Sequence, residues 1–113
     1  IPIPLHSKKE FIRGYNQSLK LSQGVSATTS IPVIQALKRT KHHASQTKKD
    51  RFERWENVAS KFAIKEHGQP LPSHVAIVDD VLTTGATMEA ACRVLLEQQP
   101  GIKISIITLA IAD

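Results

Sequence analysis

The chain has 113 residues, fewer than the roughly 150 expected of an average domain, which excludes a pair of full domains. A composition of 41% hydrophobic and 22% charged residues, with only 5 Gly and 6 Pro, predicts an ordinary core rather than a low-complexity chain. No apolar run approaches the roughly 18 residues that a membrane-spanning helix needs, and no signal segment opens the chain. Cys92 is the single cysteine, so it forms no internal disulfide, and we expect a cytoplasmic protein.

Charge is distributed unevenly along the chain. Residues 1–65 hold 13 Lys and Arg against 4 Asp and Glu, whereas residues 66–113 hold 2 against 6. The first part therefore favours an anionic partner, for which nucleic acid, a phosphorylated metabolite and an acidic protein are all candidates. Because the chain begins at Ile1 without an initiator methionine, we also expect it to be a fragment.

The first half of the chain is irregular. Residues 1–5 alternate apolar residues with prolines, which cannot donate to a β-ladder, so they predict a sheet edge or a strand end, followed by a basic turn. Asn16 is the predicted N-cap of a helix that carries three aliphatic residues, Leu19, Leu21 and Val25. Residues 31–37 predict a short strand. Residues 38–57 are highly charged and poor in aliphatics, as in a long loop or a solvated helix.

The second half shows regular periodicity. Residues 75–78 form an apolar run typical of a strand covered on both faces, and the run stops at Asp79 and Asp80. A predicted helix follows, with an apolar stripe at i, i+3, i+4 and i+7 made by Met88, Ala91, Cys92 and Leu95. Pro100 and Gly101 end it, and residues 104–111 predict another buried strand. A crossover of this length implies parallel strands with a right-handed connection.

The loop over residues 83–87 has a chemical logic of its own. In open parallel sheets, ligands bind beyond the carboxyl ends of the strands, where this loop and the two acids are expected. The loop leads into a helix N-terminus, whose free amides attract a phosphate, and Gly85 allows close approach of the backbone. The carboxylates repel phosphate but accept hydrogen bonds from sugar hydroxyls. The combination favours a ribose phosphate, and the absence of a Walker A lysine and of GxGxxG argues against the usual nucleotide loops.

Residues 75–87, VAIVDDVLTTGAT, resemble the phosphoribosyl-pyrophosphate signature of the phosphoribosyltransferases throughout its thirteen positions. The resemblance implies an α/β, phosphoribosyltransferase-like three-layer fold, with a central parallel sheet flanked by helices, over residues 1–113. It also implies that Asp79 and Asp80 contact the ribose 2- and 3-hydroxyls. The residues implied to wrap the 5-phosphate are Thr83, Thr84, Gly85, Ala86 and Thr87.

Other parts of the chain resemble the competence protein F family, also called ComF or GntX-like proteins. The matching blocks are residues 2–6 with Lys8 and Lys9, residues 13–17, and a central block of Gln46, Arg54, Asn57, Val58 and Phe62. Lys49 departs from the pattern, because the family usually has an apolar residue there. Members usually carry an N-terminal zinc module that is absent here, which fits an N-terminally truncated chain. The resemblance implies a role in DNA uptake or DNA use.

The same resemblance implies further site residues. Lys8, Lys9 and Arg13 follow the first strand, where the family has its pyrophosphate loop. Residues 40–57 resemble the flexible catalytic loop, from which Arg54 or Lys48 would reach pyrophosphate. Mg²⁺ is implied as a cofactor held through the donor near the paired acids, without direct protein ligands. Each assignment has a plain structural alternative. The paired acids could cap a turn, and residues 83–87 could form an ordinary strand-to-helix turn. Lys8, Lys9 and Arg13 could form a solvated basic turn, and residues 40–57 a charged surface segment.

The sequence therefore leads to three functional hypotheses. The favoured one is binding of phosphoribosyl pyrophosphate with magnesium and transfer of the phosphoribosyl group to an unidentified acceptor. The second is a module that keeps the donor pocket as a sensor or scaffold in DNA-uptake machinery without turnover. The third is direct DNA binding through the basic first part, which predicts an affinity that falls steeply with salt. DNA-uptake proteins and a second copy of the chain stay open as partners.

Overall fold

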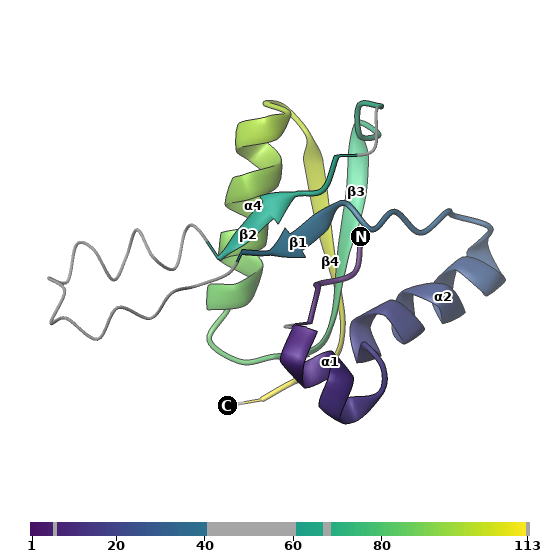
Figure 1. Cartoon of the computed structure of the whole chain (residues 1–113). Coiled ribbons are helices and arrows are strands. Elements are labelled where there is room, and N and C mark those ends of the chain that lie inside the picture. The colour runs from purple at the N-terminus through teal and green to yellow at the C-terminus, as the bar shows by residue number, and fades with distance from the viewer. Residues whose placement is uncertain (6, 41–60, 67–68, 113) are drawn as a thin grey trace, which may run out of the picture.

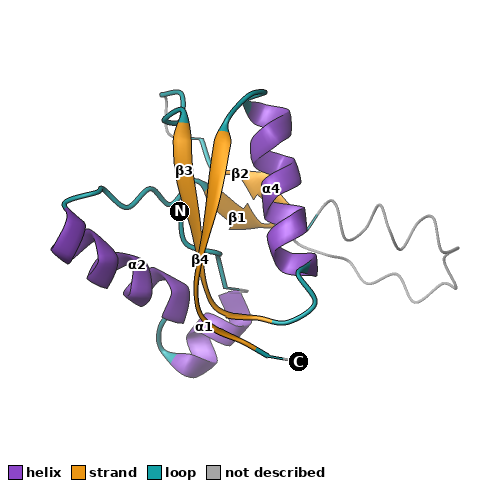
Figure 2. Ribbon diagram, turned by 180° about the vertical axis from the view of Figure 1, so that it is seen from behind, coloured by secondary structure: helices purple, strands orange, loops and turns teal. Residues whose placement is uncertain are grey.

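The computed structural model describes residues 1–5, 7–40, 61–66 and 69–112. The parallel strands β3 (His74–Leu82) and β4 (Lys103–Ile111) form its centre. Helix α2 (Gln17–Thr29) lies on one face of this sheet and helix α4 (Ala86–Gln98) on the other (Figures 1 and 2). The predicted α/β fold, with a parallel sheet flanked by helices, is confirmed. None of the described helices is long and apolar enough to cross a membrane.

The β3–α4–β4 unit follows the predicted periodicities. The two strands pair in parallel from His74 opposite Lys103 to Leu82 opposite Ile111. Helix α4 ends just before Pro100, and Gly101 turns the chain with a φ of 85° into β4. A left-handed φ suits glycine because it has no Cβ to clash with the neighbouring carbonyl.

The first residues add a short parallel segment to the other edge of β3. Pro2 forms a bridge to Val78, the Ile3 amide donates to the Val78 carbonyl at 2.9 Å, and the Val78 amide donates to the Ile1 carbonyl at 2.9 Å. Ile3 therefore supplies the amide hydrogen that pairs with β3, while Pro2 and Pro4 on either side of it have none to donate. This placement confirms the prediction of a strand end at a sheet edge.

Two elements near the start differ from their prediction. The expected basic turn is helix α1 (Ser7–Arg13), which Gly14 ends in a left-handed conformation while its amide donates to the Glu10 carbonyl at 2.7 Å. The strand predicted over residues 31–37 is wrong except for its last residue. Strand β1 (Leu37–Arg39) pairs antiparallel with β2 (Phe62–Ile64). Pro32 has no amide hydrogen for a ladder, and within residues 31–37 the first buried residue is Ala36.

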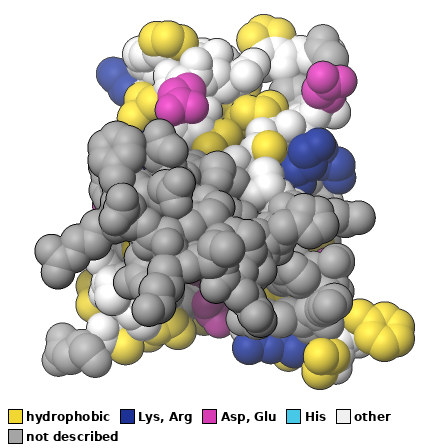
Figure 3. Space-filling model, turned by 60° about the vertical axis from the view of Figure 1, so that its left-hand side comes forward, with side chains coloured by type: hydrophobic (Ala, Val, Ile, Leu, Met, Phe, Trp, Pro, Cys, Tyr) yellow, Lys and Arg dark blue, Asp and Glu magenta, His cyan; other side chains and the backbone are white. Residues whose placement is uncertain are grey.

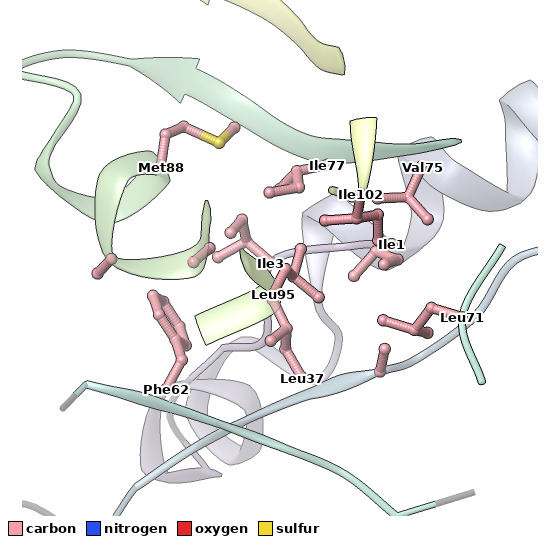
Figure 4. Packing of buried hydrophobic residues seen from close by; sticks show 13 residues of the cluster. Ile1, Ile3, Leu37, Phe62, Leu71, Val75, Ile77, Met88, Leu95 and Ile102 are labelled. Atoms are coloured by element: carbon pink, nitrogen blue, oxygen red, sulfur yellow. The ribbon is translucent and has the colours of Figure 1, made fainter. Parts of the chain in front are cut away.

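The main apolar core lies between α4, the β1–β2 pair and the facing side of the sheet. Ile77 of β3 and Leu95 of α4 are fully buried, and Phe62 closes the cluster from β2 (Figure 4). Ile1 and Ile3 from the first segment point into the same cluster. The core therefore fixes the first segment, β3 and α4 relative to one another at the end of the sheet where the signature residues lie.

Strand β4 is far more exposed than predicted. Ile106, Leu109 and Ile111 keep 48%, 73% and 74% of their surface accessible. Among the described strands β4 pairs only with β3, so its outer edge is open (Figure 2). An unbroken apolar run predicts a strand that is buried on both faces. Its actual burial depends on the strands and helices that pack against it, which the run itself does not specify.

The core assignment can be tested with two adjacent leucines of α4. Leu95→Ala should lower the free energy of unfolding by about 2–5 kcal/mol, because it opens a cavity in the cluster. Leu96 is 45% exposed, so Leu96→Ala should change that free energy by only about 0.5 kcal/mol. Urea unfolding followed by circular dichroism measures both, and equal losses in the two variants would show that the helix is oriented differently.

Candidate functional site

The paired acids of the signature lie within strand β3 rather than after it. Asp79 is in register with Thr108 of β4, and the strand continues to Leu82. Thr108 Oγ1 donates to the Asp80 carbonyl at 3.1 Å, which ties the two strands together at this point. The apolar run of residues 75–78 predicted too short a strand, because β-pairing continues after hydrophobicity stops. The acids still stand in the carboxyl half of the strand, as the site requires.

A polar cavity of about 160 Å³ opens beside these acids. Its walls come from β3, from the first segment, from α1 and α2, from β1 and from the start of α4. The charged and polar side chains that line it are Arg13, Asn16, Gln17, Ser18, Arg39, Asp79, Asp80 and Thr87. The cavity therefore brings two guanidinium groups and two carboxylates to one place.

A second, larger cavity of about 270 Å³ lies between α2, residues 31–34 and β3. Its lining is almost wholly apolar, with Val25, Ile34 and Val78 among its residues. Recognition of a phosphorylated sugar needs convergent polar groups, so the smaller polar cavity is the candidate site.

Asp79 is half-buried and held by two donors. Its Oδ1 accepts from Ser18 Oγ at 3.0 Å and from the Asp80 amide at 2.9 Å. Burial raises the pKa of Asp79, and the nearby Asp80 charge adds to the rise, while the amide and hydroxyl bonds oppose it. Partial burial of this carboxylate therefore has an energetic cost, which is characteristic of binding and catalytic positions.

Asp80 has a different environment. Its Oδ1 accepts from the Val81 amide at 2.9 Å, and its side chain is only partly buried. Together the two carboxylates present acceptor atoms to the cavity. Such a pair suits a ligand with neighbouring hydroxyl groups, because ionised carboxylates only accept hydrogen bonds.

Arg39 is a site residue that sequence reasoning missed. Its Nε donates to the Pro4 carbonyl at 2.8 Å, and its guanidinium lies 5.0 Å from the centre of the Phe62 ring. Burial lowers the pKa of Arg39, and the Asp79 carboxylate counters that effect, so the guanidinium stays charged. In the sequence, Arg39 is one basic residue just after the predicted strand. It could not be distinguished from the many other charged residues of the stretch that begins there.

The mouth of helix α4 adjoins the cavity. Gly85 precedes the helix with a φ of 85°, and the Ala86 amide donates to Thr84 Oγ1 at 3.3 Å. The first amides of a helix have no acceptor within it, and no acceptor for the Thr87 amide is found in the described part of the chain. The Thr87 side chain lines the cavity, so the helix mouth offers a donor surface beside the acids.

The structure brings together only part of the predicted residue set. Arg13, Asp79, Asp80 and Thr87 share the cavity, while Thr83, Thr84 and Gly85 form the turn from β3 into α4, whose first residue is Ala86. The backbone of Lys8 and Lys9 lies in α1, not in a turn. Arg54, Lys48 and nearly all of the predicted loop over residues 40–57 fall outside the described residues.

The described residues also bear on the expected magnesium ion. Among them no group of three or more His, Cys, Asp or Glu side chains could hold a metal. The carboxylate oxygens of Asp79 and Asp80 are ligands of the kind that Mg²⁺ accepts, so the residues present are compatible with the ion.

Comparison with known proteins gives consistent matches. The family model for the phosphoribosyl transferase domain matches residues 63–113. Competence protein F of Haemophilus influenzae is 36% identical over 97 residues, which is 84% of this chain and 42% of that protein. Competence protein ComFC of Bacillus subtilis is 29% identical over 109 residues, 96% of this chain and 42% of that protein. The DNA utilization protein YhgH of Salmonella typhi is 32% identical over 103 residues, which is 85% of this chain and 42% of that protein.

The matched region contains β3, the paired acids and the mouth of α4, so fold and site define a phosphoribosyltransferase-type domain. Within that class, the matched relatives are consistent with the competence protein F family. It spans about two fifths of the length of the curated relatives that it matches. No solved structure matches the chain.

The raised pKa of Asp79 predicts a stability effect with a definite sign. The stability associated with this carboxyl is present below its unfolded pKa, about 3.9, and is lost as the pH rises through the higher folded pKa. Asp79→Asn does not titrate and keeps an acceptor for Ser18. Its Tm should therefore exceed that of the wild type at pH 7, and the difference should shrink below pH 4.

Differential scanning fluorimetry at both pH values measures this effect. Glu97→Gln neutralises an exposed carboxylate of α4 and serves as the control, with little change in Tm expected at either pH. A lower Tm for Asp79→Asn than for the wild type at pH 7 would contradict the burial of a costly charge.

Proposed function

We propose that this domain binds phosphoribosyl pyrophosphate together with magnesium, and transfers the phosphoribosyl group to an acceptor. The observation that carries the proposal is the polar cavity in which Asp79 and Asp80 face Arg13, Arg39 and the mouth of α4. A ribose carrying phosphates at both ends requires acceptors in the middle and anion donors around them. The lining of the cavity includes both kinds of group, which supports the proposal.

The ribose hydroxyls would lie against the two carboxylates of β3. Each carboxylate has one oxygen engaged with the protein, at the Asp80 amide and Ser18 for Asp79 and at the Val81 amide for Asp80. The two side chains also interact with each other, and both line the cavity, where their oxygens can accept from the ligand. Vicinal hydroxyls on a sugar are a natural match for two such acceptors.

The two phosphorylated ends would lie on either side of the acids. The turn of residues 83–87 would take the 5-phosphate, because it presents backbone amides and hydroxyls at a helix N-terminus. Arg13 and Arg39 would take the pyrophosphate, for which planar guanidinium groups are well shaped. Arg54 of the loop stays a further candidate for that end, as do Lys8 and Lys9.

The chemistry of transfer follows from this arrangement. An acceptor nucleophile forms a bond to ribose C1 while the C1–O bond to pyrophosphate breaks, the electron pair leaves on the pyrophosphate oxygen, and the nucleophile gives up its proton. When bound, magnesium would neutralise charge on the leaving pyrophosphate. Asp79 and Asp80 would hold the ribose in place through its hydroxyls, and Arg13 and Arg39 would stabilise the negative charge that accumulates on the leaving group.

The family relationship supports a biological setting in DNA uptake or DNA use. Two relatives are named as competence proteins and a third as a DNA utilization protein. Direct DNA binding has weaker support in the described residues. On the face drawn in Figure 3, the Lys and Arg side chains that are visible lie in separate places, with acidic side chains near them.

Calorimetry tests the proposed ligand directly. The purified protein should bind phosphoribosyl pyrophosphate in the presence of magnesium, and Asp79→Asn combined with Asp80→Asn should weaken binding by about 30-fold or more, because hydrogen bonds to charged groups contribute about 1.5–3 kcal/mol each. Glu97→Gln is the matched loss of one carboxylate away from the cavity and should bind like the wild type. Equal affinity for the double variant and the wild type would refute the assignment.

Arg39 provides a second test that separates the two ends of the donor. Arg39→Gln should weaken binding of phosphoribosyl pyrophosphate by about 10-fold or more, and binding of ribose 5-phosphate by less than about threefold, because the latter lacks the pyrophosphate. Lys38→Gln, at the exposed neighbouring position of β1, is the control. A similar loss for both ligands would argue against Arg39 at the pyrophosphate end.

Turnover distinguishes an enzyme from a sensor or scaffold that uses the same pocket. Release of pyrophosphate from the donor, measured with a panel of nucleophilic bases and amines, would establish transfer. Tight donor binding with no pyrophosphate release under any condition would favour the sensor. Binding to single-stranded DNA that weakens steeply with salt and survives loss of the two acids would favour direct DNA binding.

A further inference from the structure

The buried face of helix α2 is polar at the point where it meets the sheet. Ser18 and Ser22 are 5% and 4% exposed, whereas the aliphatic residues of the helix are only partly covered. Helix α2 packs against β3, and Ser18 Oγ donates to Asp79 Oδ1 at 3.0 Å across 61 positions of sequence. Because leucine or alanine would fill such a position without a polar atom, a buried hydroxyl there needs a reason.

We propose that Ser18 is a positioning residue that fixes the orientation of the Asp79 carboxylate toward the ligand cavity. This role rests on the proposed function, since it concerns how the site holds the ribose. Oδ1 of Asp79 accepts both the Ser18 hydroxyl and the Asp80 amide, so this oxygen is directed inward. Asp79 also lines the polar cavity, so its carboxylate is within reach of a ligand there.

Helix α2 holds the Ser18 hydroxyl on a firmly anchored element. Asn16 caps the helix by accepting from the Ser18 and Leu19 amides at 2.9 and 3.3 Å, and its own Nδ2 donates to the Ile3 carbonyl at 3.1 Å. Ile3 in turn pairs with Val78, one residue before Asp79. The first segment, the helix start and β3 thus form a closed set of contacts around the carboxylate.

This arrangement removes rotational freedom from Asp79 before the ligand arrives. An acceptor that is already oriented loses less entropy on binding than one that must be ordered by the ligand. Without the hydroxyl, Asp79 loses the one bond that reaches it from α2, and its side chain can turn within the half-buried space. The expected consequence is weaker ribose binding in a fold that is otherwise intact.

Ser22 offers a matched control one helical turn away. It is equally buried, but its Oγ donates to the Ser18 carbonyl at 2.9 Å, which is a contact within the helix. Ser22→Ala therefore removes the same atoms from the same buried face and leaves the bond to Asp79 in place. Any effect that both substitutions share reflects packing of α2 rather than the carboxylate.

The test compares the wild type with Ser18→Ala, Ser18→Thr and Ser22→Ala by calorimetry, using phosphoribosyl pyrophosphate with magnesium and, separately, pyrophosphate with magnesium. Ser18→Ala should weaken binding of the ribosyl donor by about 3- to 30-fold and binding of pyrophosphate by less than twofold. Ser18→Thr keeps the hydroxyl and should recover most of the affinity, and Ser22→Ala should bind like the wild type. Thermal unfolding of each variant verifies that the fold is retained.

Three results would overturn the role of Ser18 while leaving the proposed function in place. They are donor affinity in Ser18→Ala equal to that of the wild type, an equal loss for donor and pyrophosphate, and a matching loss in Ser22→Ala. A wild-type protein that does not bind the ribosyl donor at all overturns the proposed function, and the role of Ser18 with it.

Discussion

The half-buried carboxylate of Asp79 is the constraint on which the rest of the site depends. Its burial is unfavourable for a charge, as the raised pKa shows, and it is tolerated because a hydroxyl and an amide donate to one oxygen. Those donors come from α2 and from β3 itself. The helix must therefore be held at a defined place on the sheet, and the first segment does this through Asn16 and Ile3.

The apolar core supports this arrangement next to the site. Ile77 of β3 packs with Leu95 of α4 in this core. This packing fixes the position of the β3–α4 turn relative to the acids of β3. Stability and site chemistry are thereby divided along one strand. Ile77 packs in the apolar core and stabilises the fold, whereas the polar groups around Asp79, two residues further along β3, accept an energetic penalty, as functional sites commonly do.

The second half of the chain could be predicted from the sequence. Its apolar runs and its helical stripe of apolar residues correspond directly to β3, α4 and β4. The cap at Asn16 was also visible, since its chemistry is local. Contacts between distant positions were not. Ser18 reaches Asp79 across the fold, and Arg39 enters the cavity only because β1 pairs with β2 beside Pro4. Exposure of β4 was missed because an apolar run carries no information about the strand beside it.

The central claim is that a phosphorylated ribose sits between the acids of β3 and the mouth of α4. An amide NMR titration of the purified protein with phosphoribosyl pyrophosphate and magnesium tests it most directly. The account predicts saturable shifts concentrated at residues 79–81 and 83–87, with smaller shifts at the start of α2. Saturable shifts confined to the apolar cavity under α2, or no shifts at residues 79–87 at saturating ligand, would contradict it.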